Sequence, residues 1–105
     1  MAPDNRVILT GKVATSAQRH YRPDGSPVIQ FSLELDGTED ISFEKGRSLI
    51  HIVALGNLAE SDSNLFQNGQ SLRVEGRLKQ RHWETPEGRH RSRMEVIATG
   101  LSRLE

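Results

Sequence analysis

The chain has 105 residues, of which 34% are hydrophobic and 27% charged, so it is long enough for one domain with a single modest core. Its 14 basic and 14 acidic residues cancel, and the net charge of the whole protein therefore cannot draw it to an anionic partner. The absence of cysteine excludes disulfides and thiolate metal sites.

Neither the N-terminus nor any apolar run indicates export or membrane insertion. The opening residues, MAPDN, do not resemble a signal peptide, and no apolar run approaches the roughly 20 residues of a membrane span. We therefore expect a cytoplasmic protein with no membrane partner. The core is thin for a monomer, which favours an oligomer. We expect one domain over residues 1–103, and the final Leu104-Glu105 is typical of a vector scar.

The first third of the chain predicts two strands around a tight turn. Arg6–Val13 is apolar and β-branched with a period of two, and Gly11 inside it indicates a bulge or a close backbone approach. Pro23–Pro27 (PDGSP) is a strong turn signal. Val28–Asp36 then alternates between apolar and polar residues, as a half-buried strand does.

A loop, a strand and a short helix are predicted next. Gly37–Gly46 is polar and acidic and predicts a loop, whereas Arg47–Leu55 predicts a buried strand. In Leu58–Phe66 the apolar residues recur at the spacing of one helix face, and Asn68-Gly69 ends this helix.

The last third predicts two long strands joined by a turn over Glu84–Gly88. The first strand has a core face with Leu72, Val74, Gly76 and Leu78. Its opposite face carries Arg73, Glu75, Arg77, Lys79, Arg81 and Trp83. On the returning strand one face carries Arg89, Arg91 and Arg93, and the face near the core carries Met94, Val96 and Ala98.

The order of these elements predicts the fold class. Five strands with a short helix between strands 3 and 4 is the order of the all-β OB fold, a Greek-key barrel. An SH3-like barrel or a split sheet would also use these strands, and the position of the helix favours the OB fold.

The predicted hairpin concentrates basic charge around one aromatic side chain. Six of the 14 basic residues lie between Arg77 and Arg93, together with Trp83, the only tryptophan. Like charges on paired strands repel, so a phosphate backbone would relieve them, and a tryptophan on a basic face suits base stacking. The alternatives are a core or interface tryptophan and a solvated hairpin whose charges prevent edge aggregation. The pattern favours single-stranded nucleic acid.

Other candidate sites are weaker. Tyr21 lies among basic residues before the Pro-Asp-Gly turn, so it is either a second stacking residue or a packing residue. The spacing of the four histidines (His20, His51, His82 and His90) fits no ordinary zinc site. The acidic middle is typical of a solvated loop, and no nucleophile or phosphate-binding motif is present. We expect no enzyme activity, cofactor, metal or small-molecule substrate.

Several segments resemble bacterial single-stranded DNA-binding proteins, in the family's order and spacing and over nearly the whole chain. The matching segments are Asn5–Val13, His20–Gly25 with Val28 and Phe31–Leu33, Gly56–Glu60 (GNLAE), Gln67–Gly69, Val74–Trp83, Gly88-Arg89 and Met94–Val96. The resemblance implies an OB fold, a homodimer or homotetramer, and binding of single-stranded DNA without strong sequence preference. The residues it implies for DNA binding are Trp83, Arg77, Lys79, Arg81, Arg89, Arg91, Arg93, Tyr21, Arg22 and Lys12.

The sequence also departs from this family. Leu49-Ile50 replaces the usual Trp-His at the start of the third strand, and Leu55 replaces an aromatic near its end. The glycine-rich linker and acidic tip of the family are missing, so the chain also resembles primosomal replication protein N, a small dimeric relative. The expected role is in replication, repair or restart. The alternatives are an adaptor that docks restart proteins and binds DNA weakly, and an RNA-binding domain of cold-shock type.

Overall fold

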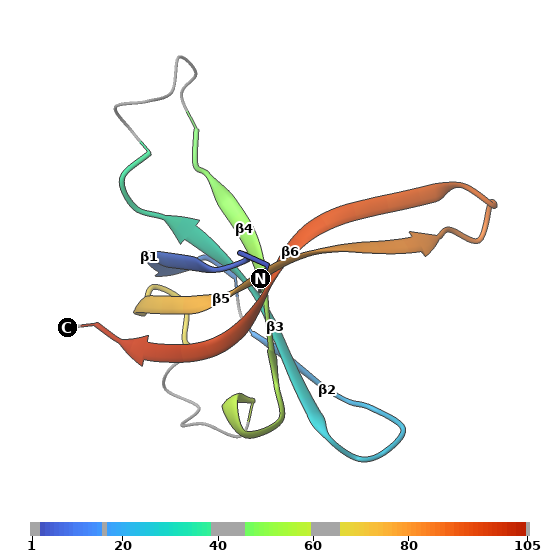
Figure 1. Cartoon of the computed structure of the whole chain (residues 1–105), viewed down its shortest axis with the longest axis horizontal. Helices are drawn as coiled ribbons and strands as arrows, with labels where there is room; N and C mark the ends of the chain where they lie inside the picture. The colour runs from blue at the N-terminus through green and yellow to red at the C-terminus, as the bar shows by residue number, and fades with distance from the viewer. Residues whose placement is uncertain (1–2, 16, 39–45, 60–65, 105) are drawn as a thin grey trace.

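The computed structural model describes residues 3–15, 17–38, 46–59 and 66–104. This part of the chain is almost entirely β-structure, and its strands are drawn in Figure 1. The elements are β1 (Val7–Val13), β2 (Gln18–Tyr21), β3 (Pro27–Leu35), β4 (Leu49–Leu55), the 3-10 turn η1 (Gly56–Leu58), β5 (Ser71–Glu84) and β6 (His90–Arg103).

The sheet closes on itself because β1 pairs with two strands. The strand order is β1-β5-β6-β4-β3-β2, and an additional pairing between β1 and β3 completes the ring. All pairings are antiparallel except that of β4 with β6, which is parallel. The predicted all-β OB fold is confirmed, with β2 as an extra short strand paired with β3. β2 was not predicted from the sequence, because its four residues, QRHY, are polar and show no alternation.

Two of the predicted connections lie largely outside the described residues. The predicted helix over 58–66 includes residues 60–65, and the predicted loop over 37–46 includes residues 39–45. Of the described residues of the predicted helix, Leu58 ends the 3-10 turn Gly56–Leu58 and Phe66 is also in 3-10 conformation.

Gly11 allows β1 to turn from one partner to the other. It lies opposite both Leu35 of β3 and Leu72 of β5. A Cβ atom on Gly11 would overlap the carbonyl oxygen of Glu34, so only glycine fits there without a backbone shift. The predicted close backbone approach is thus confirmed.

The alternating apolar residues of every long strand point into the closed ring and form its core. Phe31 packs on Phe66 with ring centroids 5.7 Å apart and the rings tilted by 55°, within the distance range of favourable aromatic pairs. The buried cluster consists of Val13, Ile29, Phe31, Leu33, Ile52, Ala54, Ala59, Phe66, Leu72, Val74, Val96 and Ala98.

The β5–β6 hairpin continues beyond the barrel. β1 accompanies β5 only as far as Gly76, and β4 accompanies β6 only from Glu95 onward. Residues 77–94 therefore form an arm that projects from the barrel (Figure 1). The assignment of Leu78 and Met94 to the core was wrong, because these side chains are 38% and 46% exposed. Their phase along the strands was predicted, but the end of the barrel was not.

Candidate nucleic-acid interface

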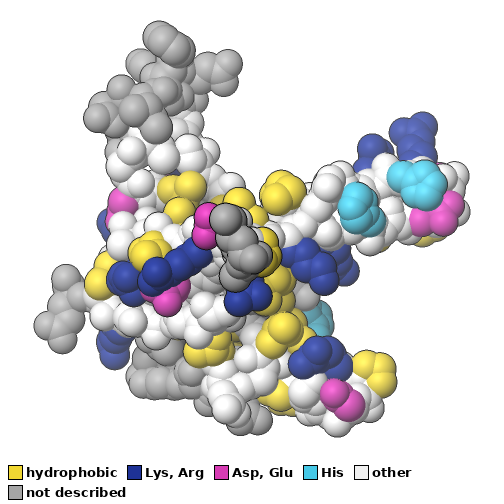
Figure 2. Space-filling model, in the orientation of Figure 1, with side chains coloured by type: hydrophobic (Ala, Val, Ile, Leu, Met, Phe, Trp, Pro, Cys, Tyr) yellow, Lys and Arg dark blue, Asp and Glu magenta, His cyan; other side chains and the backbone are white. Residues whose placement is uncertain are grey.

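The register of the arm gathers its basic residues on one face. Arg81 lies directly opposite Arg93, and Trp83 opposite Arg91, so all four side chains share a side of the hairpin. We call this side the basic face; its members in the arm are Arg77, Lys79, Arg81, Trp83, Arg91 and Arg93. The other side carries Leu78, Gln80, His82, Ser92 and Met94. Figure 2 shows basic side chains at both the base and the tip of the arm.

Trp83 is partly exposed to solvent and is flanked by two arginines. Its side chain is 39% exposed, so it is not a core residue. The Cζ atoms of Arg81 and Arg93 lie 5.7 Å and 5.6 Å from the centroid of its ring. These are cation–π distances. The structure thus places a large aromatic side chain within a cationic, accessible surface.

Glu95 lies where the basic face meets the barrel. It is 4% exposed, and its Oε2 accepts a hydrogen bond of 3.0 Å from Arg93. The same oxygen is 3.9 Å from Nη1 of Arg81 and 3.5 Å from Nε2 of His51. One buried carboxylate therefore faces two arginines and a histidine.

His51 connects this carboxylate to β3. Its Nε2 lies 3.0 Å from Oε1 of Gln30, an acceptor, so the neutral ring donates from Nε2. Burial lowers the pKa of His51 below 6.5, and the nearby Arg93 and Arg81 lower this pKa further against the opposing effect of Glu95. His51 is accordingly neutral at pH 7.

A hollow of about 400 Å³ adjoins the base of the basic face. Its walls include the aliphatic side chains of Leu55 and Ile97, and Arg77 and Lys79 line it as well. The remaining lining residues are Asn5 and Leu78. Asn5 anchors this region, because its amide donates to the Leu78 carbonyl and its Oδ1 accepts from the Leu78 N–H, both at 2.9 Å.

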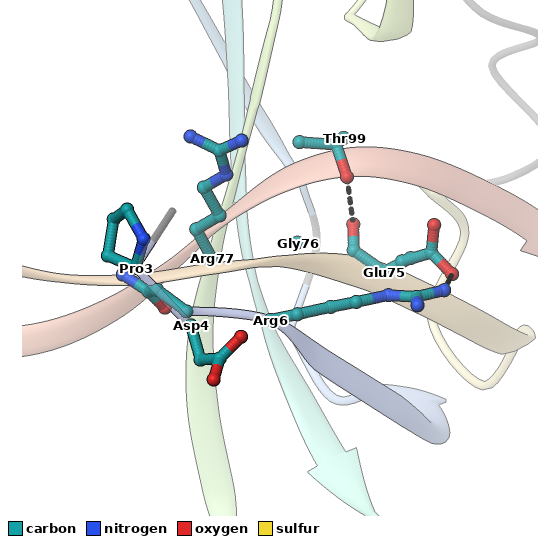
Figure 3. Close-up of a pocket in the computed structure, with 8 residues that line it drawn as sticks. Pro3, Asp4, Arg6, Glu75, Gly76, Arg77 and Thr99 are labelled. Atoms are coloured by element: carbon teal, nitrogen blue, oxygen red, sulfur yellow. Dashed lines mark hydrogen bonds and ion pairs between the residues drawn. The ribbon is translucent and has the colours of Figure 1, made fainter. Parts of the chain in front are cut away.

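Arg77 also borders a second hollow, shown in Figure 3. There Arg6 donates a 2.9 Å hydrogen bond to the carboxylate of Glu75 and lowers the pKa of that carboxyl. Figure 3 shows the Arg77 guanidinium pointing away from this ion pair. Within the described residues Arg77, Lys79 and Arg91 have no carboxylate within ion-pair distance. Their charge is thus available to an external anion.

The remaining predicted site residues lie apart from the basic face. Arg89 lies in the turn at the tip of the arm, where its backbone N–H donates a hydrogen bond to the Thr85 hydroxyl. Tyr21, 66% exposed, lies opposite Pro27 on the β2–β3 hairpin, and Arg22 in the adjoining turn donates to Ser26. Lys12 is exposed on β1, where it lies opposite Glu34 and Ser71, several residues from the arm.

Glu95, His51 and Gln30 were not predicted from the sequence to be parts of the site. Glu95 has the phase of Arg93 and not that of Met94 and Val96, and this phase was the available signal. The contact of His51 with Glu95 needs the parallel pairing of β4 with β6, which no local pattern reveals.

Two other kinds of site find no support in the part of the chain that the structure describes. No group of three or more His, Cys, Asp or Glu residues there could hold a metal ion. The described helical structure is too short to cross a membrane.

The fold and the basic face define an OB barrel with a cationic, tryptophan-bearing arm. Residues 4–104 match the Single-strand binding protein family, and the chain belongs to that family. The resemblance noted in the sequence is therefore confirmed.

Relatives from distant bacteria agree with this assignment. The chain is 31% identical over 97 residues to the single-stranded DNA-binding protein of Thermotoga maritima, covering 90% of this chain and 69% of that protein. It is 31% identical over 102 residues to single-stranded DNA-binding protein A of Bacillus subtilis, with coverages of 96% and 59%. For the Thermus thermophilus protein the identity is 36% over 104 residues, with coverages of 96% and 39%. The chain thus spans 39% to 69% of these relatives.

Proposed function

We propose that this protein binds single-stranded DNA, without catalysis and without strong sequence preference, through the basic face of the arm. The observation that carries the proposal is Trp83 exposed between Arg81 and Arg93. Every base has an aromatic surface that can stack on such a ring, so this arrangement discriminates little between sequences. Family membership supports the same conclusion.

The phosphates of the bound DNA would lie along the cations that have no ion-pair partner in the described part of the chain. Arg77 and Lys79 on β5 and Arg91 on β6 share the basic face, and none of them has an ion-pair partner among the described residues. Arginine and lysine contacts with phosphate give most of the affinity in sequence-tolerant binding. The hollow formed by Leu55 and Ile97 lies beside Arg77 and Lys79, so a second base can pack on its aliphatic wall while the cations hold its phosphate.

The proposal extends to the cellular setting. We propose a cytoplasmic protein that acts in DNA replication, repair or replication restart. A homodimer or homotetramer would provide several arms for one strand, and the exposed Ile8 on β1 and Leu49 on β4 are apolar surface that an assembly can cover.

Titration with oligo-dT tests the proposal directly. Trp83 is the only tryptophan, so its fluorescence reports on the arm alone. We expect quenching at low salt, and a plot of log affinity against log salt with a slope of about −0.7 for each phosphate contacted. A folded protein whose Trp83 fluorescence does not respond to oligo-dT at low salt would rule out the stacking role.

One observation favours a second candidate, an adaptor that docks replication-restart proteins and binds DNA weakly. Leu49, at a position where the family has tryptophan, is 47% exposed and gives the face of β4 an aliphatic character. Combining Arg81→Ala with Arg91→Ala separates the two functions. The adaptor is favoured if DNA affinity is unchanged while binding to a helicase or helicase loader is lost.

A further inference from the structure

The position of Glu95 is unusual for a surface that binds an anion. It is the only buried charged residue in the described part of the chain, and it lies directly opposite Lys79 and His51 at the base of the basic face. A carboxylate here repels a phosphate, and a buried carboxylate is tolerated only when it is paired. Its presence needs a reason other than direct contact with DNA.

The contacts of Glu95 supply that reason. Arg81 and Arg93 lie directly opposite each other on paired strands, where like charges repel. Oε2 of Glu95 is 3.0 Å from Arg93 and 3.9 Å from Arg81, so a single carboxylate offsets this repulsion. The same two guanidiniums lie within 6 Å of the centroid of the Trp83 ring. Glu95 is therefore linked to Trp83 indirectly, because both residues lie close to the same two arginines.

We propose that Glu95 is a positioning residue that holds Arg81 and Arg93 against Trp83 before single-stranded DNA binds; this proposal rests on the function proposed above. A base then stacks on a ring whose neighbours are already ordered, which lowers the entropic cost of binding. The arrangement divides the basic face in two. Arg81 and Arg93 act mainly on the stacked base, whereas Arg77, Lys79 and Arg91, which have no ion-pair partner among the described residues, act on phosphates.

Glu95→Gln tests the proposal, because it keeps the shape of the side chain and removes the charge. The matched control is Glu87→Gln in the turn of the arm, which makes the same change in charge at an exposed carboxylate without an ion pair among the described residues. In the free protein we expect Glu95→Gln to increase the quenching of Trp83 by acrylamide, since the arginines no longer cover the ring. On oligo-dT, the freed arginines should steepen the salt slope by about 0.7 to 1.4, the value for one or two more phosphates.

The result that overturns the proposal is equal behaviour of Glu95→Gln and Glu87→Gln, because a general charge effect would then suffice. The acrylamide measurement needs no DNA, so it stays informative if the wild-type protein fails to bind oligo-dT. A failure to bind oligo-dT would refute the proposed function, and the acrylamide result alone would then decide whether Glu95 positions the two arginines.

Arg91→Gln and Arg93→Gln give a second test in which the buried residue itself is not substituted. Both arginines are exposed and belong to the basic face, but only Arg93 contacts Glu95. Arg91→Gln should flatten the salt slope by about 0.7, and Arg93→Gln by less than half of that while it reduces the quenching of Trp83 by DNA. Equal effects of the two variants on slope and on quenching contradict the proposal.

Discussion

Trp83→Ala should weaken binding to single-stranded DNA without unfolding the protein. The side chain lies on the arm, beyond the last pairing of β1 with β5, and contributes nothing to the buried cluster. Stacking of one base on an aromatic side chain contributes about 1–3 kcal/mol. The substitution therefore acts on binding and spares the fold.

The structure places the expected loss in the lower part of this range. Arg81 and Arg93 already lie against the ring, so an arriving base shares the ring with them. We expect a loss of about 1–2 kcal/mol, which corresponds to a decrease in affinity of roughly 5- to 30-fold. Trp83→Phe keeps an aromatic surface and should lose less.

Fluorescence anisotropy of a labelled oligo-dT measures the loss without needing the tryptophan. Met94→Ala is the matched control, because Met94 is an exposed apolar residue on the opposite face of the same arm. We expect Met94→Ala to bind within about twofold of the wild-type protein, a difference well below that of one stacked base. If Trp83→Ala also binds within about twofold at low salt, the basic face is not where bases stack.

Three further outcomes follow from the fold and the charges. Gly11→Ala should lower the melting temperature by roughly 4–24 °C, since overpacking against the Glu34 carbonyl costs about 1–3 kcal/mol. The control Gly100→Ala should leave the melting temperature nearly unchanged, because its Cβ would meet nothing closer than Glu75 Cβ at 3.8 Å. Equal shifts of the two variants would contradict the close approach at Gly11. Because the folded-state pKa of His51 is below 6.5, protons favour the unfolded chain, and stability should fall as the pH drops below 6.5 and level off below the folded-state pKa. In urea denaturation at about pH 7.5 and 5.5, His51→Gln should reduce this fall, and an unchanged fall would show that other groups cause it. The double substitution Arg77→Ala with Lys79→Ala should flatten the salt slope of oligo-dT binding by about 1.4, and an unchanged slope would remove both residues from the phosphate path.

The sequence predicted the fold and one face of the site because both depend on local alternation. The phase of Arg77, Lys79, Arg81 and Trp83 is a property of a single strand, and it put these residues on one side before the partner strand was known. The phase along a strand could not predict how deeply each side chain is buried. Leu78 has the phase of Val74, yet it is exposed because the barrel ends at Gly76.

The Glu95 cluster could not be predicted for a different reason. It needs Arg93 and Glu95 of β6, Arg81 of β5 and His51 of β4 together. The link to β4 is its parallel pairing with β6, and these two strands are separated in the sequence by η1 and the whole of β5. Alternation within a strand carries no information about such a neighbour.

The pairing of β1 also has a consequence for the order of folding. The arm is a hairpin whose paired residues, such as Glu84 and His90, are close in sequence, whereas ring closure must bring Val7 beside Gly76. Contacts between distant residues form late, because the chain first loses the entropy of a long loop. We therefore expect the arm to assemble early and the barrel to close last, so that transition-state analysis would show substitutions near Glu84 slowing folding and substitutions in β1 mainly speeding unfolding.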